Sequence, residues 1–311
     1  MQTLAAESWR ASVLCMPKPV GPSRPALPVV PATQPASTVA PTPTAPVGAW
    51  APRPSLPDPQ VAKKHRDAAT WVPTQGTAIK NGVSADDAVQ GSLGNCYLVS
   101  GLSSLANVQP QVIRDAIREN ADGTYTVKFH KDSFLGLFSR GQKELEVTVD
   151  GDMPTKDGKT PLYAHGRDVG ELWPLIIEKA YAKLDGGYQR VGVGGSPVTI
   201  WQALTGKSGA MTANLVEGEG SLFRKLKNAL DEKRPVAAST APVLKNYEGT
   251  GLAKGHVYAI LGVSEKDGQR FVQLRNPWGQ GEPKGDGTND GVFTMPIAEF
   301  KKQFAFTYFG G

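Results

Sequence analysis

Prolines are distributed unevenly along this 311-residue chain, and their distribution decides where folding can begin. The stretch 17–59 holds 14 of the 25 prolines, mixed with Ala, Thr, Val and Ser and with almost no aromatic residues. Such a segment cannot bury enough apolar surface to offset the entropy lost on ordering. We therefore predict a disordered, partly polyproline-like tail over residues 1–75, with packing beginning between Trp71 and Asp86. A ligand for a proline-recognising partner is the less favoured interpretation.

Charge and hydropathy narrow the class of protein. The formal charge is +5, of which the first sixty residues carry +2, and no dense basic stripe interleaved with aromatic residues is present. Nucleic-acid binding is therefore not indicated. No apolar run approaches the ~18 residues of a membrane span. The N-terminal apolar stretch 12–15 is too short and lacks a basic lead, so a conventional signal peptide is not expected.

The two cysteines indicate a redox environment. Cys15 lies in the predicted tail and Cys96 in the core. A disulfide framework is therefore not expected, and a reduced thiol is. This favours a reducing cytoplasm, and export without a conventional signal peptide stays open as the alternative.

Apolar periodicity predicts an α+β fold in two lobes, a helical lobe over 76–207 and a β-rich lobe over 208–311. Helices are expected from Cys96 onward, with Leu98, Leu102 and Leu105 on one face, and over 112–119, 172–184 and 222–230. Strands are expected over 125–129, 143–149, 235–239, 257–263, 271–275 and 292–295.

Cys96 is the candidate nucleophile. It opens an apolar helix, and a thiol at a helix N-terminus faces unpaired N–H groups and the positive end of the helix dipole, which favour the thiolate. His256 and Asn276 follow in the chain order of papain-like cysteine proteases. A lone cysteine on an apolar helix is usually a buried small hydrophobe, but these companions favour a reactive one.

The spacing of two predicted strands supports the same site. Strands 257–263 and 271–275 flank an Asp-Gly turn signal at 267–268. An antiparallel pair turning near residue 266 places position 256 opposite position 276. We therefore expect His256 and Asn276 to meet at the open end of one hairpin, where an amide can hold an imidazole in a fixed tautomer.

Three sequence blocks resemble the active-site segments of the calpain family: 90–96, 255–256 and 276–279. Segments 149–155, 172–184 and 203–206 also resemble calpain core segments in the expected order. The resemblance runs from about Val83 to the C-terminus. It implies a papain-like, two-lobed calpain catalytic core that acts as a cysteine endopeptidase on proteins or peptides. Asn95 and Tyr97 depart from the aspartate and tryptophan common in the family, and loss of a carboxylate makes thiolate formation no harder.

Each candidate residue has an expected task in peptide hydrolysis. Cys96 attacks the carbonyl to form a thioester, while His256 moves the proton and Asn276 orients the imidazole. The family resemblance implies that the Gln90 amide, with the backbone N–H of Cys96, donates to the developing oxyanion. Trp278 is expected to cover the His–Asn contact and exclude water.

A cofactor is not required by the sequence, although calcium is one interpretation of an acidic loop. Glu282 stands where calpain cores resemble a calcium-binding loop, and Asp286 and Asp290 follow. Carboxylates separated by glycines suit a hard cation or an ordinary solvated loop. The chain ends soon after the stretch 292–309, so the EF-hand domain and extra β-sandwich of animal calpains are expected to be absent.

Two other functions remain open. A papain-fold acyltransferase, such as a transglutaminase or deamidase, shares the thiol chemistry, and ammonia release with an amine acceptor distinguishes it. A catalytically silent module would use the cleft for peptide capture. Labelling of Cys96 by a thiol-reactive peptide epoxide distinguishes that module from an enzyme.

Overall fold

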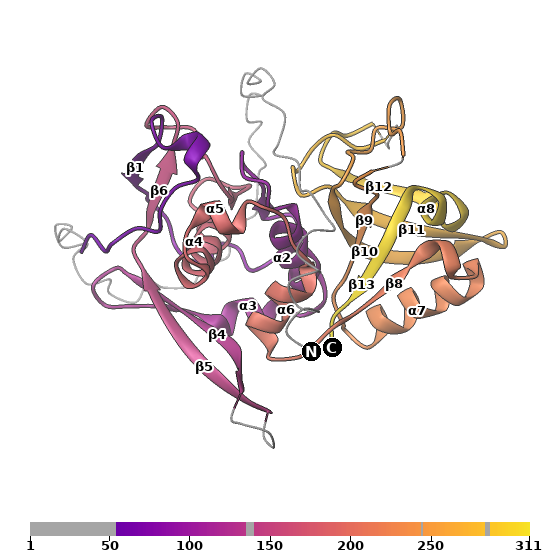
Figure 1. Ribbon diagram of the computed structural model, residues 1–311, viewed down its shortest axis with the longest axis horizontal. Coiled ribbons are helices and arrows are strands. Elements are labelled where there is room, and N and C mark those ends of the chain that lie inside the picture. The colour runs from indigo at the N-terminus through magenta and orange to yellow at the C-terminus, as the bar shows by residue number, and fades with distance from the viewer. Residues whose placement is uncertain (1–53, 135–139, 244, 284–286) are drawn as a thin grey trace, which may run out of the picture.

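The computed structural model describes residues 54–134, 140–243, 245–283 and 287–311, which form two lobes side by side (Figure 1). The helical lobe contains η2 (Lys63–His65), α2 (Cys96–Val108), α3 (Pro110–Ala116), α4 (Trp173–Asp185), α5 (Tyr188–Val191) and α6 (Pro197–Thr205), with strands β1 (Thr70–Pro73), β2 (Ala88–Val89), β3 (Ile117–Glu119), β4 (Tyr125–Phe134), β5 (Arg140–Val149), β6 (Asp152–Thr155) and β7 (His165–Gly166). The β-rich lobe contains β8 (Ala210–Ala213), η4 (Asn214–Val216), α7 (Glu219–Asp231), β9 (Val236–Thr240), β10 (Val257–Lys266), β11 (Gln269–Arg275), β12 (Val292–Pro296), α8 (Ile297–Gln303) and β13 (Phe304–Phe309). The α+β class expected from the sequence is confirmed.

One six-stranded sheet organises the β-rich lobe. Its order is β12-β11-β10-β9-β13-β8, and every neighbouring pair is antiparallel. Alternate side chains point to opposite faces of a strand. Val236 and Tyr258 accordingly pack into a cluster with Leu226 of α7 and Phe300 of α8. Ala237, Val257 and Tyr308 instead join the core around α2. The sheet is therefore covered on one face by α7 and α8, and its other face meets α2.

Helix α2 lies between the two lobes (Figure 1), and nearly all of it is buried. Its sequence contains no charged residue, as suits a helix buried on most sides. Gly101 lets α6 cross closely, because a Cβ there would stand 2.4 Å from the Ile200 side chain. The Trp201 indole also donates to the Gly101 carbonyl at 2.8 Å. This packing fixes the helix whose first residue is Cys96.

The prediction of a helix over 112–119 is wrong at the C-terminal end of that range. Helix α3 ends at Ala116, and Ile117 is already extended at φ −111° and ψ 125°. Residues 117–119 form β3, in which Ile117 pairs with Val127 of β4. Pairing of a β-branched residue with a neighbouring strand has overridden its weak helix propensity. Helices α6 and α8 and strands β8 and β13 were not predicted as elements.

The β10–β11 hairpin turns close to the predicted point, but its register differs. Asp267 and Gly268 both have positive φ, as a two-residue turn between paired Lys266 and Gln269 requires. The direct partner of Arg275 is Ala259, so positions 256 and 276 are diagonal neighbours rather than opposite residues. A bulge between Ile260 and Gly262 shifts the register by one residue. Because side chains alternate, that shift returns both candidate residues to the same face.

Packing begins before residue 76, although the sequence predicted a disordered tail over residues 1–75. The buried ammonium of Lys179 pairs with Asp58 and with Asp150. Ala62 is buried and donates its N–H to the Tyr163 hydroxyl at 2.9 Å. Strand β1 pairs with β6 along its whole length. Residues 1–53 lie outside the described residues, so a disordered tail stays a prediction there.

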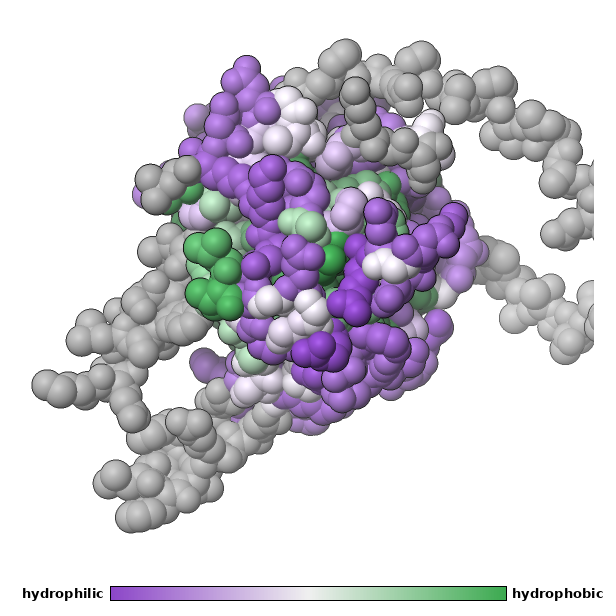
Figure 2. Space-filling model, turned by 90° about the vertical axis from the view of Figure 1, so that its right-hand side faces the viewer, coloured by the Kyte–Doolittle hydropathy of each residue, from purple (hydrophilic) through white to green (hydrophobic). Residues whose placement is uncertain are grey.

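The outer face of the β-rich lobe is mostly hydrophilic (Figure 2), with green confined to small areas. Within the described ranges, no helix combines the length and hydropathy needed to cross a membrane.

Candidate active site

Cys96 is the first residue of α2 and is fully buried. Asn95 precedes it in a non-helical conformation, and its carbonyl accepts from the N–H groups of Leu98 and Val99 at 2.9 and 3.2 Å. The Cys96 sulfur accepts the N–H of Val257, the residue after His256, at 3.3 Å. The structure thus brings the sulfur beside the peptide that carries the candidate base. A backbone N–H and a helix N-terminus both favour negative charge on sulfur.

A polar stripe runs along the face of α2 that meets the β-rich lobe. Its members, spaced i, i+4, i+7 and i+11, are Cys96, Ser100, Ser103 and Asn107. Each contacts the other lobe: Ser100 Oγ donates to Val257 O at 2.7 Å, Ser103 Oγ accepts from Arg275 Nη1 at 3.0 Å, and Asn107 Nδ2 donates to Leu261 O at 2.9 Å. The helix therefore carries the nucleophile and the polar contacts between lobes on one stripe.

His256 is buried immediately before β10. Its N–H donates to Thr240 Oγ1 at 2.9 Å, and that hydroxyl donates in turn to Ala253 O at 2.7 Å. Thr240, the last residue of β9, therefore fixes the backbone from which the imidazole projects. This contact had no signal in the sequence, because a threonine at a strand end is common.

The imidazole is held in one tautomer by Asn276. Its Nε2 lies 3.0 Å from Asn276 Oδ1. The orientation of the amide follows from its other bonds, since Nδ2 donates to Gly281 O at 2.8 Å and Oδ1 accepts from Trp278 N at 3.1 Å. An amide oxygen only accepts, so Nε2 carries the hydrogen in the neutral ring. The basic nitrogen is therefore Nδ1, which is buried without a hydrogen-bond partner among the described residues.

Aromatic rings enclose His256. The Trp278 ring centroid lies 4.4 Å from the imidazole centroid, and Tyr258 meets it edge-on at 4.9 Å. Burial lowers the pKa of His256 from 6.5 to about 4, while the bond with Asn276 acts in the opposite direction. The ring is therefore neutral near pH 7 and able to accept a proton.

Gln90 is buried and belongs to the loop that leads to Cys96. Its Nε2 donates to Leu93 O at 2.6 Å, and Oε1 has no partner among the described residues. Its backbone N–H donates to Pro277 O at 2.8 Å, which ties this loop to the chain just after Asn276. An amide nitrogen carries two hydrogens, so the bond to Leu93 leaves one for another acceptor. The oxyanion role stays a prediction.

Sequence reasoning missed a buried carboxylate next to the nucleophile. Glu178 of α4 is fully buried and accepts from Asn95 Nδ2 and, at 2.9 Å, from Ala164 N. Burial raises the pKa of Glu178 to about 7, and both hydrogen bonds act against that rise. The available signal was the pair Glu178-Lys179 directly after the apolar run 173–177 of α4, which is unusual unless both charges have partners.

The second cysteine, Cys15, lies outside the described residues, so the expectation of a reduced thiol at Cys96 stays a prediction. That expectation rests on the placement of Cys15 in the predicted tail and of Cys96 at the candidate site. Attack by Cys96 requires the reduced form, because the thiolate is the nucleophile.

Calcium binding by the acidic loop stays a prediction, because one of its three carboxylates lies outside the described residues. Glu282 Oε2 accepts from Gly291 N at 2.9 Å, and Asp290 Oδ1 accepts from Val292 N at 2.8 Å. Asp286 lies outside the described residues. No group of three or more His, Cys, Asp or Glu side chains suited to a metal occurs in the described part of the chain. These contacts account for Glu282 and Asp290 as loop-forming residues.

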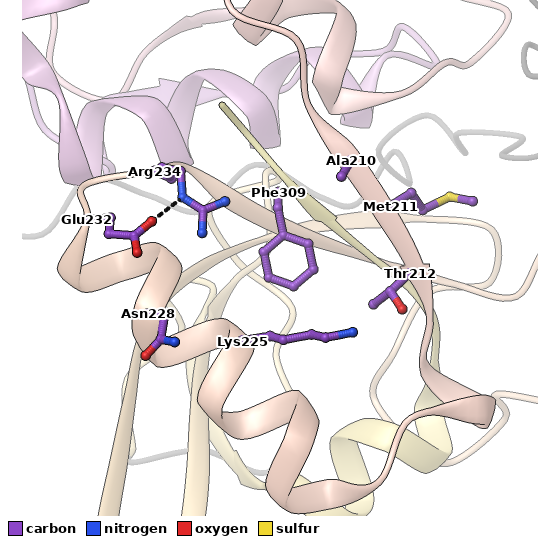
Figure 3. A pocket seen from close by; sticks show the side chains of 8 residues that line it. All are labelled: Ala210, Met211, Thr212, Lys225, Asn228, Glu232, Arg234 and Phe309. Carbon is purple, nitrogen blue, oxygen red and sulfur yellow. Dashed lines mark hydrogen bonds and ion pairs between the residues drawn. The ribbon is translucent and has the colours of Figure 1, made fainter.

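A separate cavity of about 360 Å³ lies on the β-rich lobe (Figure 3). It is bounded by α7, β8 and the end of β13, with Lys225 and Phe309 among its lining side chains. Lys225 pairs with Glu217, and Arg234 pairs with Glu232. None of its lining residues belongs to the candidate active site.

Comparison with known proteins places this arrangement in a family. A family model described as calpain family cysteine protease matches residues 60–292. Calpain-8 of Mus musculus is 29% identical over 257 residues, covering 73% of this chain and 35% of the relative. Calpain-5 of Caenorhabditis elegans is 33% identical over 245 residues, covering 67% and 36%. A calpain-type cysteine protease, ADL1, of Oryza sativa subsp. japonica is 31% identical over 217 residues, covering 67% and 10%. The chain spans about a third or less of the length of these relatives, and it belongs to the calpain family of cysteine proteases.

Proposed function

We propose that the reduced protein is a cysteine endopeptidase that hydrolyses protein or peptide substrates with Cys96, His256 and Asn276. The observation that carries the proposal is the pairing of His256 Nε2 with Asn276 Oδ1 at 3.0 Å. That pairing leaves Nδ1 as the basic nitrogen of His256. The N–H of the next residue, Val257, contacts the Cys96 sulfur.

The proposed reaction has two halves. The Cys96 thiol gives its proton to Nδ1 of His256 and the sulfur attacks the substrate carbonyl. The imidazolium then protonates the leaving amine, which departs and leaves a thioester. Water, deprotonated by the same imidazole, attacks the thioester and regenerates the thiol.

Two hydrogen-bond donors would stabilise the negative charge that develops on the carbonyl oxygen. The negative oxygen formed on the carbonyl would accept from the backbone N–H of Cys96 and from the second hydrogen of the Gln90 amide. Trp278 packs against the imidazole and keeps water from the His–Asn bond, which strengthens that bond in a low dielectric. Cys96 and His256 are both fully buried, so a substrate reaches them only when the surrounding chain moves.

The deamidase or transglutaminase alternative differs only in the acyl donor and acceptor. No observation in the structure favours an amide side chain over a peptide bond as the substrate. The membership in a protease family supports peptide hydrolysis, and the substrates of the longer relatives carry over only as a proposal.

The test is digestion of casein by the purified, reduced protein, with mass spectrometry of new peptide ends. We expect Cys96→Ala to lower turnover by more than about 10³-fold, His256→Ala by nearly as much, and Asn276→Ala by about ten- to a hundredfold because it only orients the base. His130→Ala, on β4, is the matched control and should keep full activity. Full turnover by Cys96→Ala would contradict the proposal, and ammonia release without new peptide ends would favour the acyltransferase.

A further inference from the structure

Arg275 is a fully buried charged side chain next to Asn276, at the end of β11. Its guanidinium makes three bonds to the helical lobe. Nε donates to Asp86 Oδ1 at 3.1 Å, Nη2 donates to Asp86 O at 2.8 Å, and Nη1 donates to Ser103 Oγ at 3.0 Å. Burying a charged guanidinium costs free energy of desolvation, and this cost is offset only where several acceptors form hydrogen bonds with it.

The bond to Ser103 connects the two halves of the active site. Ser103 stands seven residues after Cys96 on the same stripe of α2, about 10 Å along the helix axis. Arg275 is the direct chain neighbour of the residue that orients His256. A rotation of one lobe against the other that separates Cys96 from His256 must therefore also stretch the Arg275–Ser103 bond.

The bonds to Asp86 bring in a third part of the site. Asp86 lies just before β2, which leads directly into Gln90. Its carbonyl accepts from Arg275 and also, at 3.2 Å, from Arg167 Nε. Arg167 in turn donates through Nη2 to Asp290 O at 2.8 Å, which adds a second link between the lobes. The nucleophile's helix, the Gln90 segment and the Asn276 strand thus meet at one guanidinium.

We propose that Arg275 is a positioning residue that holds the two lobes in the alignment needed for proton transfer between Cys96 and His256. The proposal rests on the proposed function, and it assigns the joining of the lobes to a side chain of this chain rather than to a bound ion. Arg275 touches neither the substrate nor the reacting atoms.

The chemistry of the side chain suits this task. A planar guanidinium presents donors in several directions at once, so it can bind two acceptors of Asp86 and one hydroxyl together, which an ammonium cannot reproduce. Burial lowers the pKa of Arg275 to about 10, so the group stays protonated at neutral pH. The Asp86 carboxylate is half-exposed, whereas Ser103 and the guanidinium are buried. Salt should therefore weaken the link only in part.

The test uses variants of the reduced protein on one peptide substrate. Arg275→Lys keeps the charge and loses the fork, and we expect kcat to fall about ten- to a hundredfold. Asp86→Ala removes one acceptor at an exposed position, and we expect kcat to fall about three- to tenfold with KM within about twofold. Asp86→Asn keeps an oxygen acceptor for Nε and should restore most of the lost kcat. Arg270 lies on the same strand as Arg275 and forms an exposed pair with Glu265 of β10. Arg270→Ala should leave kcat unchanged.

A second readout does not depend on turnover. The pH dependence of Cys96 alkylation reports how well the imidazole stabilises the thiolate. Asp86→Ala should shift that profile to higher pH, and Arg270→Ala should not. Unchanged kcat and an unchanged alkylation profile in both Asp86→Ala and a folded Arg275→Lys would overturn the inference. The proposed function would stand if Cys96→Ala were still inactive, and would fall with the inference if it were active.

Discussion

The two lobes build their parts of the site in different ways. The helical lobe contributes Cys96, placed by the start of one helix that is packed on nearly every side. The β-rich lobe contributes His256 and Asn276, placed relative to each other by the pairing of two strands and a bulge. The base and its orienting amide are therefore aligned within one hairpin. The distance from sulfur to imidazole depends on the interface between lobes, which is the part of the site most open to regulation.

The lobes also bury titratable groups of opposite kind beside the site. On the helical side Glu178 has a pKa raised to about 7, and on the β-rich side His256 has a pKa lowered to about 4. Desolvation is the main cause in both cases, and it favours the neutral form of each group. Each lobe therefore places beside the site one titratable side chain whose neutral form is favoured by burial.

Among the tests that distinguish the contributions of the two lobes, the largest loss of kcat is expected for Gln90, the helical-lobe residue proposed to bind the oxyanion. Gln90→Ala should lower kcat by about 10²- to 10³-fold, because an oxyanion donor acts mainly in the transition state. KM should change little, as steady-state kinetics on a peptide would show. Gln202→Ala, on α6, is the control for a glutamine outside the site. A loss confined to KM would assign Gln90 to substrate binding instead.

The opposite pKa shifts predict a specific dependence of stability on pH. His256 has a folded pKa below its ordinary 6.5, so its contribution to the free energy of unfolding falls as pH drops from 6.5 to about 4. Glu178 has a folded pKa above its ordinary 4.5, so its contribution is present below pH 4.5 and is lost as pH rises to about 7. Between pH 4.5 and 6.5 the two slopes oppose each other.

Glu178→Gln should expose the His256 slope. In this variant the free energy of unfolding should rise by about 2 kcal/mol more than in the natural protein between pH 4.5 and 6.5. Urea unfolding at several pH values measures the difference. Glu146→Gln, which changes an exposed carboxylate paired with Arg118, is the control and should follow the natural protein. Parallel curves for Glu178→Gln and the natural protein would show that Glu178 does not carry the raised pKa.

The smallest effect is expected from calcium. Millimolar calcium should raise activity by less than about threefold, because Arg275 already joins the lobes in the proposed arrangement. Glu282→Ala should weaken that response, if the acidic loop binds the ion. Activity measured in calcium and in chelator tests this. A response much larger than threefold would mean that an ion, rather than Arg275, sets the alignment of the lobes.

The sequence predicted the local parts of the site better than their connections. The helix at Cys96 and the hairpin turn at residues 267–268 were predicted because periodicity and turn chemistry are local. The register of His256 was off by two residues, because the turn lies at Asp267 and Gly268 rather than on Lys266, and the bulge in β10 shifts the register back by only one residue. The contacts of Arg275 and Glu178 join segments far apart in the chain, so only the fold reveals them.

In the proposed mechanism a nucleophile from one lobe is activated by a base from the other. The most direct measurement is covalent labelling of the reduced protein with a peptide epoxide, with the modified cysteine identified by mass spectrometry. A Cys15→Ser variant serves as the control for the second cysteine. We predict that the label is found on Cys96 and that His256→Ala lowers the labelling rate by more than about a hundredfold near pH 7. Labelling of Cys96 at an unchanged rate in folded His256→Ala would contradict the account.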